Sequence, residues 1–345
     1  MQRAFLKIST LVPGLLAGLL SFGAAPAQAD TLTIYTTREP GLIAPLIEMF
    51  ETDTGNKVET VFMKDGLGER VAAEGRLSKA DVLMAVDVGN LTDFVEKGVT
   101  QPVRSEALEA AVPAQLRDAE GRWFALSARA RVLYASKERV SQKDITYEQL
   151  AQPEWKGRLC LRSGQHPYNI ALIAAYIAHH GEAKAEEWLK GVKANLARKA
   201  AGGDRDVARD ILGGICDAGL ANSYYVGAMR SGKGGEEQKK WGEAINVLLP
   251  KFEDGATHVN VSGAGVARHA PNRDLAVKFL EFLVSDKGQE LYAQANFEYP
   301  VKDGVAISPL IAELGTLAPD TMPLSEVAKH RKKASELVDK VGFDG

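Results

Sequence analysis

The chain has 345 residues but only two cysteines, Cys160 and Cys216, and this scarcity excludes several classes of protein. Two cysteines are too few for a disulfide-rich scaffold, and they form no CxxC pair. The 6 histidines form no HExxH or HxH motif, so the ligand spacing of a zinc site is missing. Walker and G-x-S-x-G loops are absent as well. With no pairing of a nucleophile and a base visible, we expect a protein that is not an enzyme.

Positive charge is not in excess either. The chain has 42 Lys and Arg residues against 45 Asp and Glu residues, which gives a formal net charge of −3 at pH 7. No basic run with interleaved aromatic residues occurs. Nucleic acid is therefore not an expected partner.

A long apolar run near the start of the chain predicts a secretory signal over residues 1–29. Two basic residues precede the run Ile8–Phe22, and Ala27-Gln28-Ala29 fits a small-x-small cleavage site, so the mature chain is expected to begin at Asp30. The run is short for a membrane span, and no stop-transfer charges follow it. No cysteine stands at the cleavage point, which argues against a lipid anchor there. These features predict an exported protein, located in the periplasm of a bacterium.

In an oxidising compartment the two cysteines are most simply explained by a disulfide. Both lie in apolar runs, Leu159–Leu161 and Ile215–Asp217, and each run comes just ahead of a tyrosine-bearing turn. Two neighbouring strands would bring Cys160 and Cys216 within bridging distance. Two buried free thiols are the alternative.

Strands and helices alternate from the beginning of the mature chain. The β-α-β-α-β pattern predicts a mostly parallel sheet with helices on both faces, and ligands of such sheets lie beyond the carboxyl ends of the strands. The predicted strands are 32–35, 57–63 and 81–86, and the predicted helices are 42–54, 66–75 and 91–97, with Gly55 ending the first helix. Asp87 is expected to cap the last helix, and the alternative is that it lines a ligand cleft.

A second α/β unit follows, and two extended segments, 123–134 and 257–261, are predicted to cross between the two units. We expect a signal peptide over 1–29, a first lobe of 30–128 plus 258–300, and a second lobe of 129–257 plus 301–345. In the second unit we predict strands at 158–162 and 215–220, helices at 168–180, 185–200 and 204–212 (the last capped by Asp204), and a long helix at 275–295.

Three tyrosines lie where predicted strands turn into helices. Tyr224 and Tyr225 follow Asn222 and Ser223, either of which is a suitable N-cap, and Tyr168 follows Pro167, a residue favoured at the first helical position. The positive end of a helix favours an anion, so a phenol there is expected to ionise more easily than one in a core. Phenolates are hard oxygen ligands that suit Fe³⁺. The alternative is packing, with each ring buried and its hydroxyl in water.

The whole mature chain resembles the ferric-ion-binding proteins of bacterial ABC importers. The resemblance implies an α/β, two-lobed periplasmic-binding-protein fold of type II, hinged by crossover strands, which closes around its ligand. It also implies that Tyr168, Tyr224 and Tyr225 bind Fe³⁺. The segments that carry the resemblance are ADVLMAVDVGNL (80–91), SARARVLY (127–134), LCLRSGQHPYN (159–169), GDRDVARDILGGICDAGLANSYYVG (203–227) and SGAGVARHAPN (262–272).

The first lobe departs from the family pattern, because Glu39 and Pro40 stand where many relatives carry a His, often followed by Tyr. Glu39 is a candidate carboxylate ligand for Fe³⁺, or else a solvated acid at the start of a helix. Some relatives complete the metal sphere with carbonate or a similar anion held by arginine. The matching candidate here is Arg129, with Arg38 or Arg131 as helpers, since a guanidinium fits a planar oxyanion with two hydrogen bonds. An exposed crossover charge is the alternative for Arg131.

Other charged groups are expected to lie outside the ligand set. Arg205 either steadies a phenolate from behind or is a surface charge. His179 and His180, at a helix end before Gly181, are expected on the surface, and residues 232–240 are expected to form a solvated loop.

The resemblance implies a monomer that captures Fe³⁺ in the periplasm and delivers it to an inner-membrane permease and its ATPase. The alternative function is binding of a small organic solute such as a polyamine, thiamine or a phosphonate. In that case the tyrosines would stack on the ligand or hydrogen-bond to it.

Overall fold

The computed structural model describes residues 30–345 together with Met1, so the predicted signal segment lies outside the described residues. Within the described part, none of the helices is long and apolar enough to cross a membrane.

One seven-stranded sheet runs through the described chain, in the order β2-β1-β3-β7-β4-β5, with β6 also paired to β4. The pairs β1–β2 and β1–β3 are parallel, as predicted, whereas every pair that involves β7, β5 or β6 is antiparallel. The strands are β1 (Thr31–Thr36), β2 (Lys57–Phe62), β3 (Val82–Ala85), β4 (Phe124–Ser136), β5 (Ala218–Asn222), β6 (Ile245–Leu248) and β7 (Val259–Val266).

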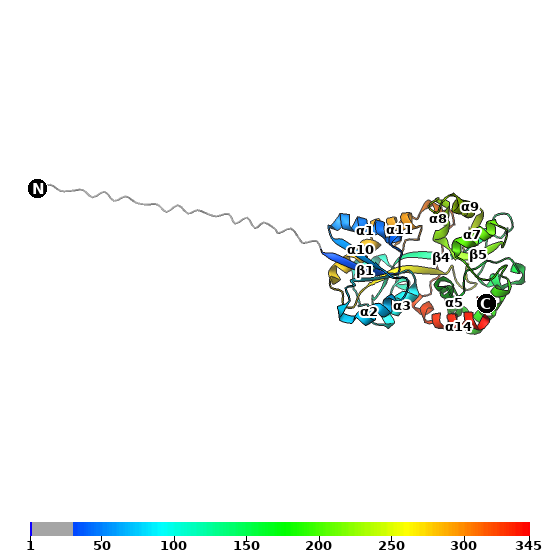
Figure 1. Cartoon of the computed structure of the whole chain (residues 1–345), viewed down its shortest axis with the longest axis horizontal. Coiled ribbons are helices and arrows are strands. Elements are labelled where there is room, and N and C mark those ends of the chain that lie inside the picture. Colours follow the sequence, from blue (N-terminus) through cyan, green and yellow to red (C-terminus); the bar gives the residue numbers. More distant parts are fainter. Residues whose placement is uncertain (2–29) are drawn as a thin grey trace.

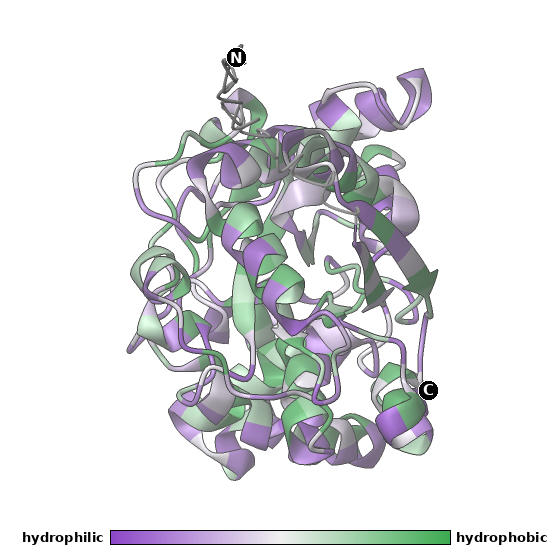
Figure 2. Cartoon of the chain, turned by 90° about the vertical axis from the view of Figure 1, so that its left-hand side faces the viewer, coloured by the Kyte–Doolittle hydropathy of each residue, from purple (hydrophilic) through white to green (hydrophobic). Residues whose placement is uncertain are grey.

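Helices cover this sheet, and the peripheral ones alternate between hydrophilic and hydrophobic residues along their length (Figure 2). They are α1 (Pro40–Thr54), α2 (Leu67–Glu74), α3 (Val88–Glu96), α4 (Glu106–Ala111), α5 (Pro167–His180), α6 (Glu182–Ala194), α7 (Asp204–Leu212), α8 (Ser223–Arg230), α9 (Glu236–Glu243), α10 (Arg273–Val284), α11 (Asp286–Asn296), α12 (Pro309–Ala312), α13 (Leu324–Lys329) and α14 (Arg331–Val341).

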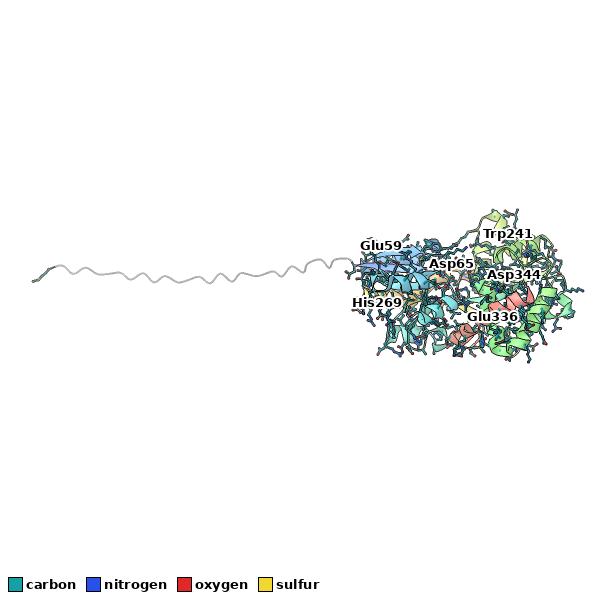
Figure 3. All side chains as sticks on the ribbon, turned by 60° about the horizontal axis from the view of Figure 1, so that its bottom comes forward. Glu59, Asp65, Trp241, His269, Glu336 and Asp344 are labelled. Carbon is teal, nitrogen blue, oxygen red and sulfur yellow. A yellow bond between two sulfur atoms is a disulfide. The ribbon has the colours of Figure 1, made fainter. Side chains whose placement is uncertain are left out.

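Strand β4 joins two halves of the molecule, because its hydrogen-bonding partner changes along its length. Residues 124–130 pair with β7, and residues 131–136 pair with β5 and β6. Figure 1 shows the result: α1, α2, α3 and β1 lie in one half, and α5, α7, β5 and α14 lie in the other. The side chains of Glu59 and His269 lie on the first half, and those of Trp241 and Glu336 on the second (Figure 3).

Several local predictions are confirmed. Gly55 ends α1 with a φ of 72°, a backbone conformation that glycine adopts without strain. Asp87 caps α3, since its Oδ1 accepts hydrogen bonds from the backbone N–H groups of Gly89 at 2.8 Å and Asn90 at 3.3 Å. The two long extended segments are confirmed as well, as parts of β4 and β7.

Other local predictions are wrong. Residues 158–162 form no strand, and the chain there makes only isolated bridges at Leu159. The predicted helix 275–295 is two helices, because Ser285 ends α10 and caps α11 with its hydroxyl. Asp204 does not cap α7; Gly203 occupies the cap position, and its N–H donates to the side chain of Asp206 at 2.7 Å.

The two adjacent histidines are not surface residues. The side chains of His179 and His180 are 7% and 12% exposed. His179 lies between Asp254 and Asp320, at 3.1 and 2.6 Å, and His180 contacts Glu148 at 2.6 Å. Carboxylates from distant segments therefore bury both rings, which the sequence pattern does not reveal.

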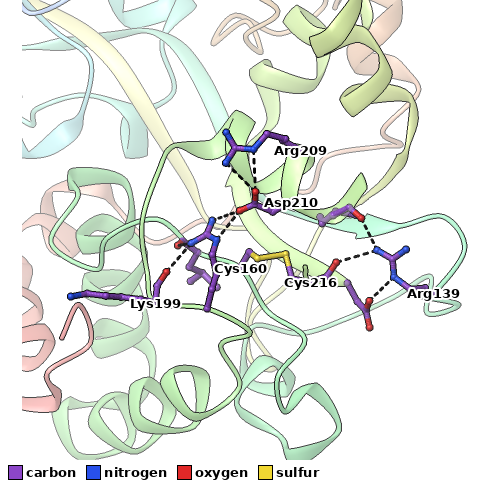
Figure 4. The surroundings of a disulfide bond; sticks show 10 residues. Arg139, Cys160, Lys199, Arg209, Asp210 and Cys216 are labelled. Carbon is purple, nitrogen blue, oxygen red and sulfur yellow. Dashed lines mark hydrogen bonds and ion pairs between the residues drawn. A yellow bond between two sulfur atoms is a disulfide. The ribbon is translucent and has the colours of Figure 1, made fainter. Parts of the chain in front are cut away.

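The predicted disulfide between Cys160 and Cys216 is present, and both residues are buried (Figure 4). The two segments lie side by side even though only one of them leads into a strand, because the N–H of Cys160 donates to the carbonyl of Ala218 at 2.9 Å. Arginine–carboxylate pairs flank the bond, among them Arg139 with Asp217 at 2.6 Å.

Candidate functional site

A cleft of about 340 Å³ opens between the two halves of the molecule. The half that contains β1 contributes Arg38 and Glu39 from the loop after that strand, and β4 contributes Arg129. The other half contributes the three predicted tyrosines, Tyr168 from α5 and Tyr224 and Tyr225 from α8. The structure therefore brings residues that are distant in sequence to one cavity.

Each tyrosine lies in the first turn of its helix, as predicted. Pro167 is the first residue of α5, and the ring Nδ1 of His166 accepts a hydrogen bond from the N–H of Tyr168 at 3.3 Å. Helix α8 begins at Ser223, directly after β5. Asn222 occupies its cap position without a side-chain cap, and the Ser223 hydroxyl accepts a hydrogen bond from the N–H of Ala130 instead.

The three phenols are in contact with one another. The hydroxyl oxygens of Tyr168 and Tyr224 are 3.2 Å apart, and the ring centroids of Tyr224 and Tyr225 are 4.2 Å apart. Among residues 30–345, no group of three or more His, Cys, Asp or Glu side chains is arranged to hold a metal ion. The three phenol oxygens are therefore the largest set of neighbouring hard donors among the described residues of the cleft, and Glu39 adds a carboxylate to its lining.

In the protein without a ligand, burial opposes the ionisation of two of these phenols. Burial and the neighbouring phenols raise the pKa of Tyr224 well above its usual value. Burial, followed by the neighbouring Tyr168, raises the pKa of Tyr225 to about 12. Removal from water thus opposes the ionisation that a helix N-terminus favours. A bound cation is required to hold these groups as phenolates at neutral pH.

Arg129 is a buried cation at the base of the cleft. It is 2% exposed, and its guanidinium hydrogen-bonds to the Ser262 hydroxyl at 3.2 Å and to the carbonyl of Val86. It lies 5.5 Å from the centre of the Tyr168 ring. In the described part of the chain it forms no ion pair with a carboxylate, so its charge is available to an anion in the cleft.

Arg38 is also buried, but its charge is balanced. Its Nη2 lies 3.0 Å from Glu298, and its Nη1 donates to Ser262 at 2.8 Å. The hydroxyl of Ser127 donates to the same carboxylate. Arg38 and Glu298 therefore form a neutral pair in the wall of the cleft, and Arg38 is a weaker anion candidate than Arg129.

Arg131 does not lie where the sequence suggests. It is neither an exposed crossover charge nor a cleft residue, because it is 2% exposed and pairs with Asp204 at 2.7 Å inside the second half. Arg205, by contrast, lines the cleft with its guanidinium 5.1 Å from the centre of the Tyr225 ring. Glu39 also lines the cleft and is exposed there.

Several charged or polar cleft residues were not predicted from the sequence, and three of them are Lys233, Gln238 and Glu298. Lys233 and Gln238 come from the segment 232–240, which was expected to be a solvated loop, although α9 begins inside it. The Nζ of Lys233 donates to the carbonyl of Ala295 at 2.7 Å and thereby connects the two sides of the cleft. Glu298 also lines the cleft. It is a single acid in the otherwise uncharged stretch 291–301, and this was the sequence feature that could have indicated a buried functional carboxylate.

Comparison with known proteins identifies the family to which this chain belongs. Residues 78–313 match the model of the family described as bacterial extracellular solute-binding protein. The chain belongs to this family. It is 39% identical over 320 residues to "Iron uptake protein A1" of Synechocystis, a match that covers 92% of this chain and 89% of that protein.

Solved structures of other solute-binding proteins have the same fold. The structure titled "Bordetella ferric binding protein" is 62% identical, with a TM-score of 0.87, and the match covers 92% of this chain and 100% of that one. A Trichodesmium protein in complex with iron and citrate ligands is 39% identical, with a TM-score of 0.87 and coverage of 91% and 100%. The family resemblance and the two-lobed α/β fold predicted from the sequence are confirmed.

Proposed function

We propose that this solute-binding protein captures Fe³⁺ in its cleft for a bacterial ABC iron importer. The observation that carries the proposal is the meeting of three phenols from two helix N-termini, with two hydroxyl oxygens only 3.2 Å apart. The printed names of the similar proteins, iron uptake protein and ferric binding protein, support the same cargo.

Charge balance is the chemical reason. Tyr168, Tyr224 and Tyr225 as phenolates carry three negative charges, which equal the charge of Fe³⁺. A buried trication without such partners would be prohibitively unfavourable. Because burial raises the pKa of Tyr224 and Tyr225, iron must displace their protons when it binds. Capture therefore releases protons, and acid weakens binding.

Other residues that line the cleft complete the metal sphere. In this proposal Arg129 holds carbonate or another oxyanion beside the metal, with Arg38 as a helper, because Arg129 is buried there without a carboxylate partner in the described chain. Glu39 is placed to supply a carboxylate oxygen instead. Arg205 lines the cleft over the Tyr225 ring and steadies that phenol.

The cellular setting follows from the family and the predicted signal. Solute-binding proteins of this kind work with ABC transporters, and we propose that this one acts in the periplasm as a monomer. It would catalyse nothing and deliver iron to a membrane permease and its ATPase. The lobes that close around the metal would be 30–128 plus 258–300 and 129–257 plus 301–345. Strand β4 changes its partner at residues 130–131, two residues after the first of these boundaries.

Titration of the iron-free protein with ferric salt, with and without carbonate, tests the proposal. We expect a phenolate-to-iron absorption band in the visible range that Tyr225→Phe weakens. Tyr176→Phe is the matched control, since Tyr176 is a buried phenol that packs on Trp188 in the second half and does not line the cleft. A colourless mixture, or full colour and affinity in Tyr225→Phe, would contradict the assignment.

The organic-solute alternative makes a different prediction. A polyamine, thiamine or a phosphonate would raise the melting temperature without any visible band. The same samples, measured by thermal unfolding with each solute, separate the two functions.

A further inference from the structure

Arg131 lies beneath the three phenols rather than beside the ligand. It does not line the cleft, yet its guanidinium makes four hydrogen bonds inside the second half. Nη1 donates to Asp204 at 2.7 Å and to the side chain of Asn222 at 3.1 Å. Nη2 donates to the side chain of Asn169 at 2.7 Å and to the carbonyl of Leu220 at 3.3 Å.

Two of these partners are chain neighbours of the candidate ligands. Asn169 directly follows Tyr168 in α5, and Asn222 comes two residues before Tyr224, at the cap of α8. Asn169 and Asn222 are 4% and 3% exposed, so water cannot readily replace Arg131. One planar guanidinium therefore fixes the distance between the two helix starts whose hydroxyl groups meet at 3.2 Å.

Asp204 connects Tyr225, the third phenol, to the guanidinium of Arg131. Its buried carboxylate accepts a hydrogen bond from the N–H of Asn222 at 2.8 Å and pairs with Arg162 at 3.2 Å. Arg162 lies 5.2 Å from the centre of the Tyr168 ring. Asp204 is also followed in α7 by Arg205, whose guanidinium lies on the Tyr225 ring. Tyr168 and Tyr225 are thus linked to the Arg131–Asp204 pair through one intervening residue, and Tyr224 is linked through Asn222 and Ser223.

We infer that the Arg131–Asp204 pair is a positioning device that sets the spacing of the three phenols before metal arrives. The inference rests on the proposed function and assigns a role to residues that do not touch the cargo. Groups behind metal ligands commonly change metal affinity by about 10–100-fold. Arg131 acts through its two-pronged shape, because a lysine keeps the charge opposite Asp204 but has a single nitrogen and cannot reach both Asn169 and Asn222.

The variant Arg131→Lys tests this role. We expect the ferric affinity, measured by competition with a chelator, to fall by about 10-fold or more while the protein stays folded. Arg139→Lys is the matched control. Like Arg131, Arg139 pairs with a carboxylate, that of Asp217, and donates to backbone carbonyls, but it lies beyond the end of β4 and away from the cleft. We expect Arg139→Lys to keep the affinity within about twofold of the parent protein, because its guanidinium touches no segment that carries a phenol.

A second readout uses the iron-free protein. Hydrogen exchange in Arg131→Lys should be faster at 166–170 and 220–226, the two segments that carry the phenols, and unchanged in β1, β2 and β3. Should Arg131→Lys not fold, Asn169→Ala breaks the same contact from the other side, and the same loss of affinity is expected.

The outcomes separate the two proposals. If the parent protein binds Fe³⁺ and Arg131→Lys binds it as tightly, or loses no more affinity than Arg139→Lys, the positioning role is refuted and the function stands. If the parent protein binds no Fe³⁺, the proposed function fails. The exchange measurement then still decides whether Arg131 orders the phenol-bearing segments, and unchanged exchange there would refute it.

Discussion

Replacing Asp204 by Asn removes a charge from the interior while keeping the size and shape of the side chain. The Asp204 side chain is fully buried and pairs with Arg131 at 2.7 Å and with Arg162 at 3.2 Å. The amide introduced by Asp204→Asn would still accept one hydrogen bond, but the buried guanidinium of Arg131 would have no opposite charge. Breaking a buried pair in this way costs about 3–5 kcal/mol.

The exposed ion pair between Asp53 and Lys287 serves as the control for the buried pair between Asp204 and Arg131. Its atoms are 2.6 Å apart, close to the Asp204–Arg131 distance, but its side chains are 37% and 53% exposed. Surface pairs of this kind contribute about 0–1 kcal/mol, because water already solvates both charges. Asp53→Asn therefore changes the same functional group at nearly the same distance, but in an exposed pair with a single lysine instead of a buried pair with two arginines.

Thermal unfolding of the iron-free variants measures the difference. At roughly 2–4 °C per kcal/mol for a unit of 150–250 residues, Asp204→Asn should lower the melting temperature by about 6 °C or more, and Asp53→Asn by at most about 4 °C. Circular dichroism at pH 7.5 is sufficient, since both variants keep the fold. If Asp204→Asn melts within about 2 °C of Asp53→Asn, burial does not set how much the Asp204–Arg131 pair contributes to the free energy of unfolding, and the reasoning is refuted.

Three further predictions concern pH, the disulfide and the cleft. Burial and nearby arginines lower the pKa of His258 to about 3, below its unfolded value, so stability is full above pH 6.5 and falls as the pH falls below it. The free energy of unfolding, measured with urea, should fall by about 2 kcal/mol between pH 6.5 and pH 5. If the free energy of unfolding of a His258→Gln variant depended on pH in the same way, the prediction would be contradicted. Replacing Cys160 and Cys216 by Ala opens a loop spanning 56 positions and should cost about 4 kcal/mol; an unchanged urea midpoint would disprove this. Lys233→Ala removes the hydrogen bond to Ala295 across the cleft and should speed iron loss to a chelator several-fold, whereas equal rates would show that this contact does not slow release.

The sequence was sufficient for features that depend on short-range signals. Pro167 at the first helical position and the apolar run ahead of Asn222 place the three tyrosines at helix starts, because caps and strand ends are set by neighbouring residues. The pairing of two cysteines follows from their number and the export signal. Neither inference required knowledge of which segments pack together.

The sequence could not place groups whose surroundings come from distant segments. Glu298 and Lys233 reach the cleft only because the two halves of the molecule approach each other there. Likewise, the desolvation that raises the pKa of Tyr224 and Tyr225 is a property of the assembled cleft and has no local signature.

Arg129 and Arg131 show the division most clearly. They are two positions apart on β4 and so project from the same face of the strand. Arg129 nevertheless lines the cleft, whereas Arg131 is enclosed by Asn169, Asn222 and Asp204. The difference arises because β4 leaves β7 and joins β5 between these two residues. The amino-acid sequence determined the strand and the tyrosines at the helix starts; the tertiary pairing alone decided which arginine lines the cleft and which one is enclosed behind it.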